Sequence, residues 1–163
     1  MKTLAIATNF HKRAEVLRDE YLNAKPWLHV VVENGFRESF LDAIADEVGG
    51  APPGGYTKIH RDFEMHPDTG LFHRVNLLVY LNRDWPDSYG GSLELWPSDM
   101  SKVGRCVFPR FNTMILWETH GGTLHGLPDP VRCPPNRMRL SVASYYYTKV
   151  SVVGDFGTIG GVS

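Results

Sequence analysis

From Pro52 onward, the chain is a series of short apolar stretches separated by clusters of glycine, proline, asparagine and aspartate. These stretches are YTKIHRDF, HRVNLLVYLN, GSLELW, RCVFP, NTMILWE and RLSVASYYYT. Their shortness and their β-branched and aromatic residues are typical of strands, and the clusters between them are typical of turns. The pattern predicts an all-β sandwich or barrel and not a series of alternating βαβ units.

The first fifty residues have a different pattern, which predicts two helices around one strand. Residues 11–22 place Ala14, Leu17 and Tyr21 on one helical face. The same spacing returns over residues 36–48, where Gly49 and Gly50 are expected to end the helix. Between these helices the β-branched stretch WLHVVVE predicts a strand.

These patterns fit one domain over residues 1–163, a length that can bury a core. We expect a helical segment at 1–50 packed on a β core at 54–148. The glycine-rich stretch at 150–163 is expected to be a loose edge strand or a frayed tail.

Charge and cysteine usage limit the partners that we expect. The formal net charge of -1 and the absence of Lys/Arg runs speak against nucleic acid as a partner. No apolar run approaches the roughly 20 residues that a membrane span needs, and no signal peptide is expected. Cys106 and Cys133 form no spaced set, so neither a disulfide framework nor a zinc ribbon is predicted. We therefore expect a cytoplasmic protein with reduced thiols.

The pattern H-x-D occurs twice, and seven histidines and 18 acidic residues give about one such pair by chance. His60 and Asp62 end a β-prone run, so both side chains can face one interior. His66 and Asp68 flank Pro67 and lead into a turn sequence, which favours a loop. The first pair is therefore the candidate for a metal site.

A site of the non-haem iron(II) type takes two histidines and one carboxylate, so a third ligand is required. We expect His29 to be a half-buried strand residue and His73 to be solvated at the start of a strand. The remaining candidates are His120 and His125, which lie between two strongly predicted strands, and spacing alone does not separate them.

Two predicted strands carry polar residues on one face. Alternation over residues 139–148 places Arg139 and Ser141 together with Ala143 and Tyr145, and an arginine with a serine can bind a carboxylate. Earlier in the chain, Asn76 and Tyr80 share a face opposite apolar neighbours.

Residues 54–148 resemble the prolyl-4-hydroxylase-like iron(II)/2-oxoglutarate dioxygenases, whose core is a double-stranded β-helix, or jelly roll. The H-x-D pair, the run YLN-x-DW followed by GG-x-L, then HG-x-P-x-P and finally R-x-S occur in the order of that family. The resemblance implies a mainly β fold with N-terminal helices packed on a jelly roll.

Carried over position by position, the resemblance implies iron ligands at His60, Asp62 and His125. It also implies a binding site for the distal carboxylate of 2-oxoglutarate. That site is formed by Arg139 and Ser141, with Tyr80 as a hydroxyl donor and Tyr56 as a further residue of the pocket wall. Relatives that halogenate have a small residue in place of the carboxylate, so Asp62 favours hydroxylation.

The implied cofactors are Fe(II), the cosubstrate 2-oxoglutarate and O2, with ascorbate as a candidate reductant. The implied reaction hydroxylates an unactivated C–H bond of a peptidyl or small-molecule substrate and releases succinate and CO2. Residues 64–72, with Met65 and Phe72, are expected to form a lid or substrate loop. The main alternative is a non-enzymatic jelly-roll module that binds a carbohydrate or another ligand. A cupin-type or zinc hydrolase site would need more clustered histidines.

Overall fold

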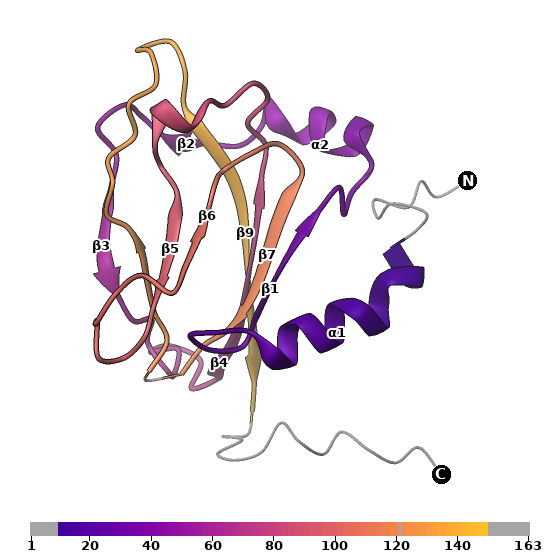
Figure 1. Cartoon of the computed structure of the whole chain (residues 1–163), viewed down its shortest axis with the longest axis vertical. Coiled ribbons are helices and arrows are strands. Elements are labelled where there is room, and N and C mark those ends of the chain that lie inside the picture. Colours follow the sequence, from indigo (N-terminus) through magenta and orange to yellow (C-terminus); the bar gives the residue numbers. More distant parts are fainter. Residues whose placement is uncertain (1–9, 121, 150–163) are drawn as a thin grey trace.

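The computed structural model describes residues 10–120 and 122–149, and these form two antiparallel β-sheets that pack face to face (Figure 1). One sheet has five strands in the order β1-β7-β4-β9-β2, and the other has four in the order β3-β8-β5-β6. The strands are β1 His29–Glu33, β2 Gly50–Ala51, β3 Thr57–His60, β4 Phe72–Tyr80, β5 Leu93–Trp96, β6 Arg105–Val107, β7 Thr113–Glu118, β8 Leu124–Leu127 and β9 Arg139–Thr148. The mainly β, two-sheet architecture expected of a double-stranded β-helix is confirmed.

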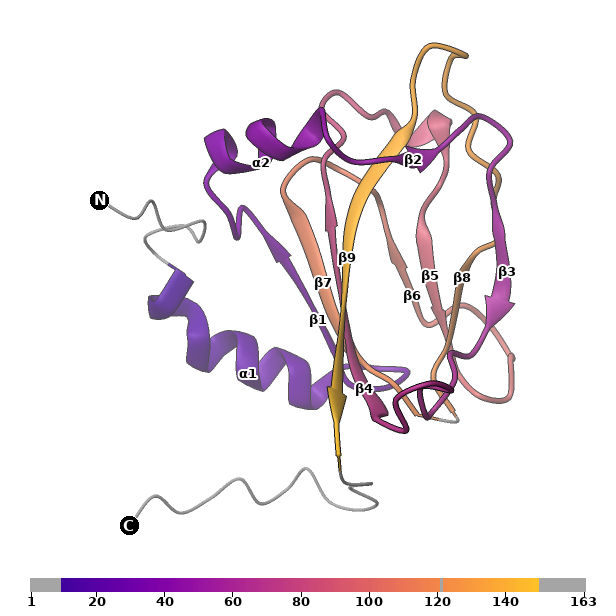
Figure 2. The same cartoon turned by 180° about the vertical axis from the view of Figure 1, so that it is seen from behind.

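Two helices lie on the five-stranded sheet, on the side away from the four-stranded sheet (Figure 2). Helix α1 spans Ala14–Asn23 after a 3-10 turn at Phe10–Arg13, and α2 spans Glu38–Ala45. Both were predicted, although α2 ends before the two glycines that were expected to stop it. No helix in the described part of the chain is long and apolar enough to cross a membrane.

The strands of the five-stranded sheet alternate between two apolar cores, as their sequence pattern requires. In β4, Val79 packs against the helices, whereas Tyr80 faces the four-stranded sheet. The core beneath the helices contains Leu17, Val30, Val32, Leu41, Val79, Leu81 and Met114. The core between the sheets contains Trp27, Tyr80, Leu93, Leu95, Val107, Ile115 and Trp117.

Two strands were not predicted from the sequence. Strand β2 has only two residues, and β8 lies in a stretch that was interpreted as the connection between two strands. Gly126 interrupts β8, so that it offers no run of alternating apolar residues. The omission matters because β8 carries His125. The prediction for residues 150–163 lies outside the described residues.

The motif YLN places Asn82 where the end of β4 meets the start of β9. Its side-chain nitrogen donates to Pro109 O at 2.7 Å and to Leu140 O at 3.0 Å, while its side-chain oxygen accepts from Leu140 N at 2.6 Å. Asn82 therefore fixes the backbone beside Arg139, the first residue of β9.

We expect Asn82→Ala to lower the free energy of unfolding by about 1–3 kcal/mol, because it leaves the Leu140 N–H without its acceptor. Urea denaturation would measure the loss. Asn23→Ala is the matched control, since that amide bonds to Asp19 O on exposed α1 and its removal should change stability little. Equal midpoints for the two variants would contradict the role given to Asn82.

Candidate metal centre

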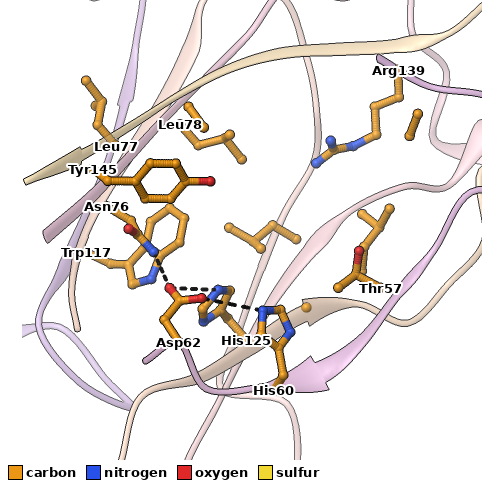
Figure 3. A pocket seen from close by; sticks show the side chains of 15 residues that line it. Thr57, His60, Asp62, Asn76, Leu77, Leu78, Trp117, His125, Arg139 and Tyr145 are labelled. Carbon is orange, nitrogen blue, oxygen red and sulfur yellow. Dashed lines mark hydrogen bonds and ion pairs between the residues drawn. The ribbon is translucent and has the colours of Figure 1, made fainter. Parts of the chain in front are cut away.

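His60, Asp62 and His125 come together at the mouth of the space between the two sheets (Figure 3). One potential ligand atom from each lies within 4.8 Å of the others. His60 Nε2 is 3.6 Å from Asp62 Oδ1, and His125 Nε2 is 3.6 Å from Asp62 Oδ2. Two imidazoles and one carboxylate are the donor set of a non-haem iron(II) site, so these residues fit that metal.

The surroundings of both histidines direct Nε2 towards the carboxylate. His60 Nδ1 lies 2.8 Å from Lys58 O and donates to it in the tautomer that leaves Nε2 with its lone pair. His125 is buried, and its ring packs edge-on against Trp117 at 5.2 Å. Burial lowers the pKa of His125, and nearby His60 lowers it further while Asp62 opposes the shift. A neutral His125 is the form that can bind a metal.

Strand pairing brings the two histidines together. His60 in β3 pairs with His125 in β8, and the register shifts between this pair and the next, Thr57 with Leu127. Such an irregularity redirects side chains beside a site. Gly126 explains the HG motif, because a β-carbon there would lie 2.7 Å from Lys58 O and push β3 away from β8.

The other histidines lie away from this group. His66 belongs to the expected turn, where its Nδ1 accepts from Asp68 N at 3.2 Å, and His120 is exposed beside Glu118. His29 is buried in β1 and bonds through Nδ1 to Trp27 O. The prediction for His73 is wrong: it is only 2% exposed, because three aromatic rings and Asn76 contact it.

Arg139 reaches into the same cavity from β9, across from the triad (Figure 3). It is 7% exposed, its Nε donates to Gly91 O at 2.6 Å, and its guanidinium lies over the Tyr80 ring at 4.8 Å. Gly91 has φ +75, and a β-carbon there would lie 2.9 Å from Arg139 Cδ, which accounts for the second glycine of the GG motif.

No acidic side chain in the described part of the chain pairs with Arg139. Burial lowers the pKa of its guanidinium, yet an arginine keeps its charge in proteins. A buried cation without a carboxylate is costly unless an anion binds it. The wall of the cavity therefore offers a site for an anionic ligand.

Of the other residues that were predicted to bind the cosubstrate, Tyr80 lies beside Arg139, whereas Ser141 and Tyr56 do not line the cavity. Tyr80 is fully buried beside Arg139, and burial raises its pKa to about 12 although Arg139 opposes the shift. The two groups interact electrostatically, but no hydrogen bond of normal geometry satisfies the Tyr80 hydroxyl within the described residues. Ser141 pairs with Tyr80 but does not line the cavity. Tyr56 is 57% exposed and is not brought to the cavity either.

The cavity has a volume of about 270 Å³ and mixed walls. Leu78, Leu93 and Leu127 supply apolar surface. Tyr145 and Thr57 also line it, and the Tyr145 hydroxyl points into it (Figure 3). Sequence alternation had already placed Tyr145 on the face of Arg139, but no role was inferred for it. Thr57 could not have been found from its position, because residues three apart in a regular strand point to opposite faces, and only the irregular pairing of β3 with β8 brings it to the side of His60.

A two-sheet β fold with this triad facing a buried arginine defines a metal-dependent jelly-roll enzyme of the oxygenase type. The family model of the 2OG-Fe(II) oxygenase superfamily matches residues 48–147, more than half of the chain. The chain belongs to this superfamily, whose members use Fe(II) and 2-oxoglutarate. The predicted superfamily, the enzyme class and the cofactors Fe(II) and 2-oxoglutarate are therefore confirmed.

Three solved structures are similar to the chain at low sequence identity, and the first of them shares its fold. A prolyl-4-hydroxylase from Pseudomonas putida is 13% identical with a TM-score of 0.66, over 90% of this chain and 97% of that one. A prolyl hydroxylase from Trichoplax adhaerens, in complex with a hypoxia inducible factor peptide fragment, is 16% identical with a TM-score of 0.47, over 87% and 77%. A prolyl 4-hydroxylase from Phytophthora capsici is 18% identical with a TM-score of 0.49, over 89% and 55%. No curated protein sequence gives a significant match.

Proposed function

We propose that this enzyme is a hydroxylase in which His60, Asp62 and His125 hold Fe(II) and Arg139 binds the far carboxylate of 2-oxoglutarate. The observation that carries the proposal is the presence of the triad and of a buried cation without a carboxylate partner among the described residues, across one cavity. A dicarboxylate can bind Arg139 with one end while its other end reaches the metal. The buried Tyr80 hydroxyl, beside Arg139, supplies a further donor.

Bound iron(II) and 2-oxoglutarate supply oxygen activation, in which O2 and the cosubstrate give succinate, CO2 and one oxygen atom for the substrate. The chain's own residues orient the reactants and limit access of water. Arg139 and Tyr80 hold the cosubstrate carboxylate by charge-assisted hydrogen bonds. Asp62 occupies the position that would otherwise be open to a halide, so the product is an alcohol.

The substrate side of the site is the open mouth near Tyr145 and the segment 64–72. Within this segment, Met65 pairs with Phe72 in an isolated bridge, and Met65 is 52% exposed. We propose this segment as the substrate loop. A peptidyl residue or a small molecule fits the site. Because the chain shares its fold with a prolyl-4-hydroxylase, prolyl peptides are the first substrates to test. The buried Arg139 and the complete triad favour this enzyme over a non-enzymatic binding module.

A turnover assay tests the proposal. The protein, anaerobically loaded with Fe(II), is given 2-oxoglutarate and ascorbate, and then O2 and a panel of prolyl peptides, free amino acids and small metabolites. We expect succinate in proportion to a product that has gained one oxygen atom. Succinate formation without 2-oxoglutarate dependence, or a halogenated product in the presence of chloride, would contradict the hydroxylase assignment.

A further inference from the structure

A short chain of hydrogen bonds leads from the metal triad into the five-stranded sheet. Asn76 Nδ2 donates to Asp62 Oδ2 at 2.7 Å, and Asn76 Oδ1 lies 2.6 Å from His73 Nε2. Asn76 and His73 are each 2% exposed. The mechanism described above uses neither residue.

The chemistry of the three groups fixes the direction of each bond. An ionised carboxylate only accepts hydrogen bonds, so the amide nitrogen of Asn76 has to face Asp62. The amide oxygen then faces His73, and it also only accepts. His73 must therefore carry its proton on Nε2 and donate it to Asn76. By donating to the amide oxygen, His73 stabilises the orientation in which the amide nitrogen of Asn76 meets the carboxylate.

An irregularity in the pairing of β4 makes the contact between His73 and Asn76 possible. In a regular strand, residues three apart point to opposite faces. The pairing of β4 with β9 shifts between His73 and Val75, so that His73 and Asn76 both reach the same side. His73 is also held by rings, stacked on Tyr147 at 4.9 Å and packed against Tyr145 at 5.6 Å. Its Nδ1 has no hydrogen-bond partner within the described residues.

We propose that His73 and Asn76 are a positioning pair that holds the Asp62 carboxylate for the metal. The hydrogen bond from Asn76 takes one lone pair of Oδ2 and so favours Oδ1, the oxygen nearer to His60, as the atom that binds the ion. His73 keeps the Asn76 amide in the donating orientation. The inference rests on the proposed ligand set, because it assigns a role to residues behind one ligand.

Anaerobic titration with cobalt(II), followed by its visible absorption and by calorimetry, tests the pair without turnover. Outer partners of metal ligands typically contribute 10–100-fold to metal affinity, so Asn76→Leu should lose affinity within that range and His73→Phe should lose about tenfold. Both should change the cobalt spectrum, because Oδ2 becomes free to join Oδ1 on the metal. His73→Phe keeps an aromatic ring against Tyr147. His73→Gln restores an amide donor towards Asn76 and should recover most of the affinity and the wild-type spectrum.

His29→Phe is the matched control, since His29 is also a buried histidine of the five-stranded sheet but bonds to Trp27 O. It should lower thermal stability as much as His73→Phe does while keeping cobalt affinity and spectrum. Wild-type affinity and spectrum in folded His73→Phe would overturn the proposal. If that variant does not fold, the same result in Asn76→Leu would overturn it. Failure of the wild-type protein to bind cobalt through the triad would instead reject the proposed ligand set.

Discussion

His125→Ala is expected to reduce 2-oxoglutarate turnover to background and to weaken Fe(II) binding sharply. The substitution removes one of two imidazoles, and the remaining histidine and carboxylate cannot complete the three-ligand face that the metal needs. His60→Ala and Asp62→Ala should have the same effect for the same reason. Succinate formation measures the first loss, and metal content after anaerobic loading and desalting measures the second.

His120→Ala is the control for this experiment, because His120 lies on the connection that leads into β8 but is exposed and outside the triad. His66→Ala serves as a second control from the other H-x-D pattern. Both variants should keep the bound metal. Loss of iron in His120→Ala together with its retention in His125→Ala would show that the third ligand has been assigned to the wrong histidine.

Arg139→Met is expected to nearly eliminate 2-oxoglutarate binding while iron binding survives. Each hydrogen bond to a charged group contributes about 1.5–3 kcal/mol, so affinity should fall tenfold or more. Arg139→Lys should fall between wild type and Arg139→Met, because lysine cannot copy the planar, two-pronged contact. Ser141→Ala should cost less, since Ser141 does not line the cavity. The absorption band of the anaerobic iron–cosubstrate complex reports the affinity.

The free energy of unfolding of the unliganded protein is an independent test of the role of Arg139. Replacing a buried cation that has no acidic partner among the described residues by an apolar side chain of similar length removes a desolvation cost, so the unliganded Arg139→Met protein should be at least as stable as wild type. Arg137→Met is the control, because Arg137 bonds to the backbone oxygens of Arg83 and Asp84 outside the cavity. Equal 2-oxoglutarate affinity in wild type and Arg139→Met would reject the assignment of Arg139 to the cosubstrate.

The fold could be predicted from the sequence where apolar alternation was long. Strand β4 and strand β9 each repeat the two-residue period over many residues and were predicted nearly to their ends. Strand β8 was missed because four residues with a glycine carry too little of that period. Its strand character comes from pairing with β3 and β5, which are distant in the sequence.

The site was predictable to the extent that local geometry sets it. The first H-x-D pair could be selected because residues i and i+2 of a strand point to the same side, and β-prone residues precede His60 and Asp62. The second pair is surrounded by residues typical of a turn. The choice between His120 and His125 depends on the register of β8 against β3. Before the structure was known, only the family resemblance indicated His125. The burial of His73 was not foreseeable, because it depends on a bulge in the pairing of β4 with β9.

Strand β3 lies at the edge of its sheet and is held there by β8 alone. An ion bound by His60, Asp62 and His125 would act as a cross-link between these strands and close a long loop of the chain. Since a ligand that binds only the native state stabilises it by mass action, metal loading and the local opening of this edge are linked equilibria. Amide hydrogen exchange in β3 should therefore slow as metal concentration rises, while exchange in β4, which has neighbours on both sides, should change little.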